Sequence, residues 1–384
     1  MVISQGHPPK RLPKIYEVRS ITERKERAVL VGLASSNHAE TLDELESLTL
    51  TAGAEVVERI LQRRDSIDPG TFLSRGKIDF LRAMVDEKTM DLVVFDEDLS
   101  PAQMRNLEKR LETKILDRNE LILAIFADRA RTREARLQVE LAQLEYLLPR
   151  LTKMWGHLSR QQGGIGTRGP GETQLEVDRR RVREKIAFLK RKLEGVEKER
   201  RVQRSRRTRV HRTALVGYTN AGKSTLLNSL TGAGVLAENK LFATLDATTR
   251  RYRFPSGGIT LFTDTVGFIR KLPHHLVASF RSTLEEVVEA DLLLHVVDAS
   301  SPHAEEQIEA VLTVLVDLKA AAVPTVMVLN KIDAAPEDRV TGLIARHTGA
   351  IPVSAEQRTG LDVLRREVEE RVTTPPTSAP AGTR

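Results

Sequence analysis

The sequence predicts an α/β protein in three parts: an N-terminal α/β domain, a long antiparallel helical hairpin, and a domain with a doubly wound sheet. Three observations predict this organisation. Short apolar runs alternate with amphipathic stretches in the first part, two sets of apolar residues repeat every three or four positions in the second, and a glycine-rich segment joins an apolar run to a helix-like run in the third. We expect domain boundaries at 1–128, 129–208 and 209–374, with a disordered tail at 375–384.

Composition excludes several classes of protein. The chain has 384 residues, enough for two or three domains, and 40% of them are apolar. It contains no cysteine, which excludes disulfides, a thiolate zinc site and a thiol nucleophile. No apolar run approaches the ~18 residues that cross a bilayer. The N-terminus is polar and lacks the apolar segment of a signal peptide, so we expect a cytoplasmic protein with no membrane span.

Positive charge is concentrated in one region. The chain has a net charge of +7, yet residues 129–212 alone hold 24 Lys or Arg against 10 Asp or Glu. The rest of the chain is therefore net negative. A solvated helical surface accounts for high charge but not for a one-sided excess, so the pattern favours a nucleic-acid partner.

The first part is expected to form a small parallel sheet. Apolar runs at 27–33, 54–57 and 91–95 predict strands, and the periodicity of 42–52 and 77–86 predicts helices between them. The acidic turn at 96–98 follows a strand, and we expect it to cap a helix that begins near Pro101. We find no catalytic constellation in this part.

The second part carries two heptad seams. One seam consists of Leu137, Leu141, Leu144, Leu148, Leu151 and Trp155, and the other of Val182, Ile186, Leu189, Leu193 and Val196. They predict two antiparallel helices, each about 45 Å long at about 1.5 Å per residue. Pro149 should kink or break the first helix.

A glycine-rich loop is expected at the tip of this hairpin. Residues 161–171 cannot continue a helix, and Glu172 and Thr173 restart one. A connector needs few residues, and long loops are usually functional, which favours a contact element over a passive link. The expected contact residues are Gly163, Gly164, Gly166, Arg168, Gly169 and Gly171. Because only 4% of residues are aromatic, structured RNA fits the composition better than a single strand does.

The third part begins with a phosphate loop. The segment reads Gly217, Tyr218, Thr219, Asn220, Ala221, Gly222, Lys223, Ser224. It lies between the apolar run 214–216 and the helix-like run 225–230, the context that this motif requires. Backbone N–H groups of such a loop bind phosphate oxygens, Lys223 should reach the β- and γ-phosphates, and the Ser224 hydroxyl should hold Mg²⁺.

Three further segments are expected to complete the site. The loop 241–249 offers Thr244, Thr248 and Thr249 as candidate metal ligands, and the residues alone leave the choice open. The strand 259–263 leads to Asp264, Thr265, Val266 and Gly267. Asp264 should hold Mg²⁺ through water, and the Gly267 N–H should sense the γ-phosphate.

Guanine specificity is expected from the two remaining motifs. The strand 326–329 leads to Asn330, Lys331, Ile332 and Asp333, and the run 351–353 leads to Ser354, Ala355 and Glu356. The Asp333 carboxylate can accept the two N–H groups that guanine, and not adenine, presents at this edge. Lys331 can lie over the base, and the backbone of 354–356 can reach the guanine carbonyl.

No catalytic side chain is certain. Phe268 follows Gly267 where a glutamine would orient water, and its ring cannot hydrogen-bond. We expect slow intrinsic hydrolysis unless a partner supplies or positions the missing group.

With these residues in place, the chain resembles the HflX family of translational GTPases over about residues 12–374. The resemblance rests on the segments 163–176, 241–246 and 264–269. It implies a Ras-like P-loop GTPase domain and places nucleotide contacts on Phe242, Ala243, Thr244, Leu245 and Asp246, with Thr244 as the metal ligand. It also implies GTP or GDP with Mg²⁺ as the ligands.

The resemblance further implies binding to the large ribosomal subunit and its RNA, with the glycine loop at the peptidyl-transferase centre. It implies splitting or rescue of stalled or idle ribosomes under stress, with hydrolysis stimulated by the ribosome. We expect a monomer that lacks the additional C-terminal domain of some relatives. Two alternatives are a checkpoint GTPase for large-subunit assembly and an RNA-binding scaffold that uses GTP structurally.

Overall fold

The computed structural model describes residues 25–34, 38–63, 67–154, 170–205, 210–232, 241–271 and 281–373. The chain divides into two compact units, Met1–Ala124 and Ile125–Arg384. Each unit has its own parallel or mixed sheet, and the fold class is α/β as predicted. Of the helices in the described ranges, none is both long enough and apolar enough to span a membrane.

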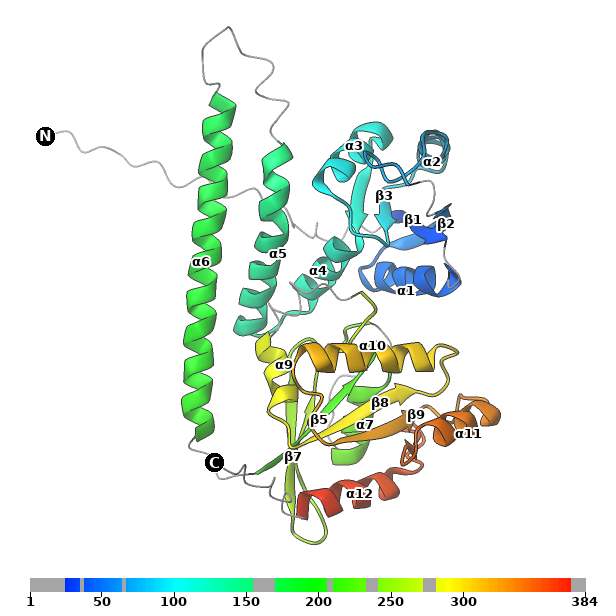
Figure 1. Cartoon of the computed structure of the whole chain (residues 1–384), viewed down its shortest axis with the longest axis vertical. Coiled ribbons are helices and arrows are strands. Elements are labelled where there is room, and N and C mark those ends of the chain that lie inside the picture. The colour runs from blue at the N-terminus through cyan, green and yellow to red at the C-terminus, as the bar shows by residue number, and fades with distance from the viewer. Residues whose placement is uncertain are drawn as a thin grey trace, which may run out of the picture. The chain divides into compact units, whose positions relative to one another are not determined.

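The first unit is a four-stranded parallel sheet with helices packed on it (Figure 1). Its elements are β1 (Arg27–Ala34), α1 (His38–Thr51), β2 (Glu55–Arg63), α2 (Arg75–Lys88), β3 (Leu92–Phe95), α3 (Pro101–Leu111), β4 (Lys114–Asp117) and the start of α4 (Arg118–Arg129). The strand order is β2-β1-β3-β4. Apolar residues of β1, β3, α2 and α3 form its core.

The strands and helices expected here are confirmed, and β4 and α4 are additions. β4 has only four residues, and its first, Lys114, is exposed, so it lacks the apolar run that marks a strand. It becomes a strand because β3 offers it a parallel partner along its whole length.

The acidic turn after β3 does not cap α3, which corrects the sequence-based expectation. The cap is Ser100: its Oγ accepts the N–H of Gln103, and the Gln103 side chain accepts the N–H of Ser100. Asp96 instead accepts from Arg118 at 2.8 Å, and Glu44 accepts from the same guanidinium at 2.6 Å. All three side chains are largely buried, so the carboxylates neutralise a cation inside the unit.

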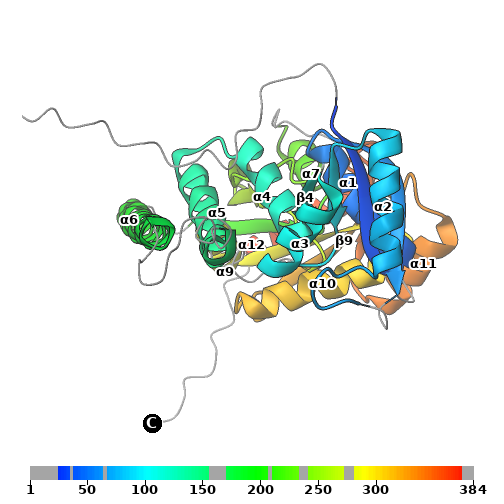
Figure 2. The same cartoon turned by 90° about the horizontal axis from the view of Figure 1, so that it is seen from above.

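In the second unit, the end of α4 is followed by two long helices that run side by side in opposite directions (Figures 1 and 2). They are α5 (Arg133–Met154) and α6 (Pro170–Ser205), here called the hairpin helices. α5 continues through Pro149, so of the two expected effects, a kink or a break, the break is absent. α6 begins at Pro170 and includes Gly171, two residues expected in the loop, because proline is favourable in the first turn of a helix.

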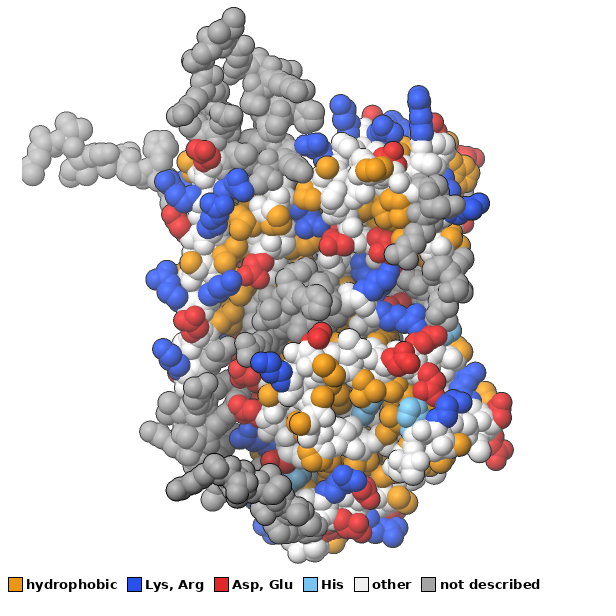
Figure 3. Space-filling model, in the orientation of Figure 1, with side chains coloured by type: hydrophobic (Ala, Val, Ile, Leu, Met, Phe, Trp, Pro, Cys, Tyr) orange, Lys and Arg blue, Asp and Glu red, His pale blue; other side chains and the backbone are white. Residues whose placement is uncertain are grey.

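The seam between the hairpin helices is apolar, as the heptad pattern predicts. Leu141, Leu151, Val182 and Leu189 are buried. Ion pairs flank the seam, from Lys185 to Glu140 and from Lys190 to Glu145. Lys and Arg side chains recur along the outer side of α6 (Figure 3). Trp155 and the loop residues 163–169 lie outside the described residues, as do Arg206, Arg207 and Arg209.

The rest of the second unit is a six-stranded sheet with the order β10-β9-β8-β5-β7-β6. Its elements are β5 (His211–Gly217), α7 (Lys223–Thr231), β6 (Thr248–Arg253), β7 (Ile259–Asp264), α9 (Arg281–Val288), β8 (Leu292–Asp298), α10 (Ala304–Asp317), β9 (Thr325–Asn330), α11 (Glu337–Arg346), β10 (Ile351–Pro352) and α12 (Leu361–Thr373). All neighbours are parallel except β6 and β7.

Helices cover both faces of this sheet, which makes it doubly wound. One core joins α7 and α12 to the strands, and a second joins α10 and α11 to β8 and β9. The parallel strands β5, β7, β8 and β9 end at Gly217, Asp264, Asp298 and Asn330. In open α/β sheets, ligands bind at this carboxyl edge, and the motif residues all follow it.

Candidate functional site

The loop between β5 and α7 has the backbone shape of a phosphate loop. Asn220 has φ 61° and Gly222 has φ 89°, both left-handed conformations. A Cβ on Gly222 would lie 2.3 Å from Asn330 Nδ2, so only glycine fits there. α7 starts at the next residue, and its free N–H groups face the loop. The arrangement can cradle an anion.

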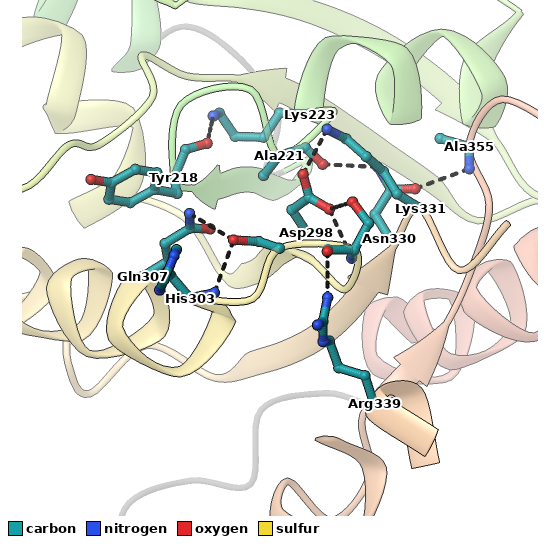
Figure 4. Close-up of polar contacts among 12 residues, drawn as sticks. Tyr218, Ala221, Lys223, Asp298, His303, Gln307, Asn330, Lys331, Arg339 and Ala355 are labelled. Atoms are coloured by element: carbon teal, nitrogen blue, oxygen red, sulfur yellow. Dashed lines mark hydrogen bonds and ion pairs between the residues drawn. The ribbon is translucent and has the colours of Figure 1, made fainter. Parts of the chain in front are cut away.

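Lys223 lies buried beneath this loop. Its Nζ donates to the carbonyl oxygen of Tyr218 at 2.8 Å (Figure 4) and to that of Gly217 at 3.2 Å. Burial lowers the pKa of the Lys223 ammonium to about 8, with the nearby Asp264 carboxylate acting in the opposite direction. A polyphosphate placed in the loop would favour the charged form.

Three side chains meet beside the loop in a set that can hold a divalent cation. Asp264 Oδ2 accepts from Ser224 Oγ at 2.5 Å and from Thr244 Oγ1 at 2.9 Å, and the two hydroxyls are 2.8 Å apart. Burial raises the pKa of Asp264, opposed by Lys223 and by these hydroxyls. Its other oxygen, Oδ1, is buried and has no hydrogen-bond partner within the described part of the chain. Oxygen donors with one unused carboxylate oxygen suit Mg²⁺.

The structure separates the three candidate threonines. Only Thr244 reaches Ser224 and Asp264. Thr249 Oγ1 is instead 3.0 Å from Thr263 Oγ1, and Thr248 Oγ1 donates weakly to the carbonyl of Asp246. The geometry therefore favours Thr244 at the metal set.

One pocket opens between the phosphate loop, the loop 241–246 and the segment after β7. Phe242, Ala243 and Thr244 line it together with Lys223 and Gly267. Leu245 is buried. The Asp246 carboxylate has its hydrogen bonds elsewhere, to Arg131 and Thr132 at the start of α5.

The segment after β7 is joined to the phosphate loop through its backbone. Thr219 N–H donates to the Phe268 carbonyl at 2.7 Å, and Phe268 N–H donates to the Gly217 carbonyl at 3.1 Å. A Cβ on Gly267 would lie 2.8 Å from Thr219 Cα, so this glycine permits the close approach. The Phe268 ring is fully buried, and it therefore presents nothing to a water molecule. Thr265 Oγ1 donates to the Leu215 carbonyl, and Val266 is buried.

The carboxyl ends of β9 and β10 form the other end of the site (Figure 4). Asn330 Nδ2 donates to the Ala221 carbonyl at 2.8 Å, and Asn330 Oδ1 accepts the Ala355 N–H at 3.0 Å. One amide thus ties the phosphate loop to the segment 354–356. Ser354 and Ala355 are buried, whereas Asp333 and Glu356 are exposed. The Ile332 N–H donates to the Val353 carbonyl.

Asp298 was missed by the sequence analysis. It ends β8, and its Oδ2 lies 2.7 Å from Lys331 Nζ (Figure 4). This ion pair fixes the side chain of Lys331, the first residue after β9. A carboxylate at the carboxyl end of a central parallel strand was the signal that could have found it. Thr132, which contacts Asp246, carried no such signal.

The structure describes only one of the six expected ribosome-contact residues. Gly163, Gly164, Gly166, Arg168 and Gly169 lie outside the described residues, and Gly171 lies in the first turn of α6. The positions of these loop residues stay predictions.

A phosphate loop, an Asp-x-x-Gly segment and an Asn-Lys-x-Asp segment at the carboxyl edge of a doubly wound sheet define a P-loop GTPase. Three family models match: a GTP-binding GTPase N-terminal region at residues 39–127, a GTP-binding GTPase middle region at 129–207, and a 50S ribosome-binding GTPase at 212–331. The chain belongs to the HflX family of GTPases, as its relatives show.

Three relatives, each named GTPase HflX, show the extent of the similarity. That of Caldanaerobacter subterraneus subsp. tengcongensis is 50% identical over 358 residues, covering 92% of this chain and 82% of the relative. That of Flavobacterium psychrophilum is 54% identical over 314 residues, covering 80% and 76%. That of Escherichia coli K12 is 47% identical over 353 residues, covering 90% and 83%.

A solved structure is similar in fold as well. The crystal structure of SsGBP in complex with GDP aligns with a TM-score of 0.51 at 26% identity. The alignment covers 91% of this chain and 98% of that protein. The sequence-based recognition of the family, the fold class and the GTPase activity are confirmed.

Proposed function

We propose that this GTPase binds GTP together with Mg²⁺ and acts on the large ribosomal subunit, where it splits or rescues stalled ribosomes. The ribosome stimulates its otherwise slow hydrolysis. The protein acts as a monomer in the cytoplasm, under conditions of stress.

Each part of the site has a role in this proposal. The backbone of 217–224 and Lys223 bind the phosphates, and Ser224 and Thr244 hold Mg²⁺, with Asp264 accepting from its water. When bound, Mg²⁺ neutralises charge on the β- and γ-phosphates. Asp333 accepts from the guanine N–H groups, Lys331 lies over the base, and the backbone of 354–356 meets the guanine carbonyl.

The single observation that carries the ribosomal part is the position of α6 in the chain. This basic helix ends at Ser205, and β5, the strand that leads into the phosphate loop, begins at His211. The exposed face of α6 includes Arg180, Arg183, Lys190 and Arg191. A cationic helix joined directly to a nucleotide site suits a phosphate-rich partner such as folded RNA. The description of the family model that matches residues 212–331, a 50S ribosome-binding GTPase, supports the same partner.

Dependence on a partner follows from the buried Phe268 ring. A GTPase needs a group that orients the attacking water, and Phe268 presents none. The ribosome would supply or position that group. Turnover is then confined to the bound state, as a switch requires.

The experiment compares GTP turnover by the full chain with and without purified large subunits. We expect stimulation of at least tenfold by large subunits and little by small subunits. Sedimentation of intact ribosomes with protein and GTP should show separated subunits, whereas GDP should leave them intact. Turnover indifferent to large subunits, or intact ribosomes at saturating protein, would contradict the proposal.

A variant with 163–169 shortened tests the tip loop. We expect large subunits no longer to stimulate its GTP turnover, and we expect it no longer to split ribosomes. Its GTP turnover without subunits is the reference value. The assembly checkpoint would be indicated instead by two results together. Cells depleted of this protein would accumulate precursor subunits, and the purified protein would fail to split ribosomes in vitro.

A further inference from the structure

The loop 241–246 is fastened at two places, and only one of them is the nucleotide site. At Thr244, the hydroxyl contacts Ser224 and Asp264. Two residues later, Asp246 Oδ2 accepts the backbone N–H groups of Arg131 at 3.1 Å and Thr132 at 3.2 Å, and its Oδ1 accepts from the Thr132 hydroxyl. Thr132 directly precedes α5, the first hairpin helix.

This second contact has a clear physical basis. The first N–H groups of a helix have no partner within the helix, and the helix dipole favours a negative charge there. Thr132 Oγ1 already accepts the Ala135 N–H at 3.1 Å, as a capping residue does. The Asp246 carboxylate extends this cap from 114 residues further along the chain.

An aromatic contact strengthens the same junction. The Phe242 ring meets the Phe126 ring edge-on, with centroids 4.7 Å apart, and both rings are almost fully buried. Phe126 lies in α4, just before the turn into α5. The loop that carries Thr244 therefore contacts residues 126–132, here called the root of the hairpin, through both an apolar and a charged contact.

We propose that Asp246 is a positioning residue that couples the nucleotide site to the root of the hairpin. In this arrangement Thr244 is at the metal set while Asp246 caps α5, so a ligand that holds Thr244 in place also favours the cap. By thermodynamic reciprocity, a partner that displaces α5 weakens the hold on Thr244. The inference rests on the proposed binding of GTP and Mg²⁺ and names the link through which the hairpin responds.

Hydrogen exchange at the start of α5 tests the coupling without ribosomes. We compare the amides of Arg131 and Thr132 in the full chain with Mg²⁺ and either GDP or a non-hydrolysable GTP analogue. The analogue should slow their exchange at least fivefold relative to GDP. In Asp246→Ala that difference should vanish, and in Asp246→Asn, which keeps an acceptor oxygen without the charge, it should be intermediate.

Affinity gives a second measurement that a purely structural cap would not move. Asp246→Ala should lower the affinity for the GTP analogue about tenfold while GDP affinity stays within twofold. The matched control is Ser100→Ala, which removes a comparable cap from α3 in the other unit. It should change neither the exchange difference at α5 nor the ratio of the two affinities.

Two outcomes would overturn the inference. Equal protection of the α5 amides with GDP and with the analogue in the wild type would show that the cap is static. Equal loss of both affinities in Asp246→Ala would show that Asp246 contacts the nucleotide directly. Because every measurement omits ribosomes, a failure here leaves ribosomal stimulation untouched, and a failure of that stimulation leaves this result standing.

Discussion

Lys223 links nucleotide binding to pH. Burial lowers the pKa of its ammonium group to about 8 in the free protein, whereas bound phosphates should hold it charged. A group whose free-state pKa lies below its bound-state pKa takes up a proton on binding. Affinity should therefore be nearly constant below pH 8 and fall as pH rises above it.

Calorimetry can measure this proton directly. At pH 8, binding of GDP should be accompanied by uptake of about 0.5 proton, obtained from titrations in two buffers of different ionisation enthalpy. Lys223→Arg should show uptake near zero, because a guanidinium stays charged. Absence of uptake by the wild type at pH 8 would mean that the ammonium is already fully charged.

Asp333 is expected to determine the choice of base. Asp333→Asn exchanges a carboxylate acceptor for an amide, so affinity for GTP should fall by about 10- to 100-fold, the value of one or two charge-assisted hydrogen bonds. Affinity for xanthosine triphosphate should rise. Fluorescence competition gives both values, with Asp338→Asn, an exposed aspartate of α11, as the control. An unchanged guanine preference would remove Asp333 from the base site.

At the scale of single elements, β8 contains a buried titratable group. His295 is almost fully buried, and its Nδ1 has no hydrogen-bond partner within the described residues. Burial lowers the pKa of the imidazole to about 4, with His347 and Lys223 acting in the same direction. The native state therefore excludes a proton that the unfolded chain binds below about pH 6.5.

This predicts a loss of stability in mild acid. Between pH 6.5 and 5 the His295 contribution to the free energy of unfolding should fall by about 2 kcal/mol, because each pKa unit corresponds to about 1.4 kcal/mol. Urea denaturation of wild type and His295→Leu over this range isolates the contribution. Parallel curves for the two proteins would show that folding does not lower the pKa of His295.

The stability of the hairpin helices should depend on how deeply a side chain is buried in their seam, and less on how large that side chain is. Leu189 is 1% exposed, whereas its neighbour Phe188 is 43% exposed and lies near Lys185 and Lys192. Leu189→Ala should cost about 2–4 kcal/mol of stability, as buried leucines do. Phe188→Ala should cost less than about 1 kcal/mol, because little area returns to water.

The measurement is protection of α5 and α6 amides against hydrogen exchange in the two variants. Leu189→Ala should lower it in both helices, because they share one seam. A larger effect from the more exposed Phe188 would indicate that α6 packs through a different face.

For the whole molecule, the distribution of charge predicts how binding responds to salt. The excess of 14 basic residues in 129–212 should release counterions from RNA. Affinity for large subunits should fall by about 10³-fold or more between 50 and 200 mM salt, if six or more phosphates are contacted.

Filter binding over that range gives the slope. Arg183→Ala and Arg191→Ala on the exposed side of α6 should each reduce it by about 1. Affinity that is independent of salt would exclude phosphate contacts as the main source of binding.

Much of the fold and the site could be predicted from sequence, because local patterns carry that information. The phosphate loop needs a strand, a left-handed turn and a helix in direct succession, and the sequence of residues 214–230 predicts all three. The spacing of apolar residues in the two heptad seams was enough to predict the hairpin helices. The guanine motifs each follow an apolar strand, so their convergence at one sheet edge follows from parallel topology.

The errors occurred where a tertiary partner overrides a local preference. Asp96 resembled a helix cap, yet the buried guanidinium of Arg118, 22 residues away, requires its charge. Pro149 suggested a kink or a break, and the break is absent because α5 packs against α6 as one continuous helix. β4 was invisible because its pairing with β3, and not its own composition, makes it a strand.

By itself the sequence determined the family, the class of ligand and the order of the parts, because each depends on residues adjacent in the chain. Only the tertiary structure decided that Thr244 meets Ser224 and Asp264, that Asp298 holds Lys331, and that Asp246 caps α5. Those contacts join residues separated by between 20 and 115 positions, and no local pattern encodes which distant partner will satisfy a buried charge or a helix end.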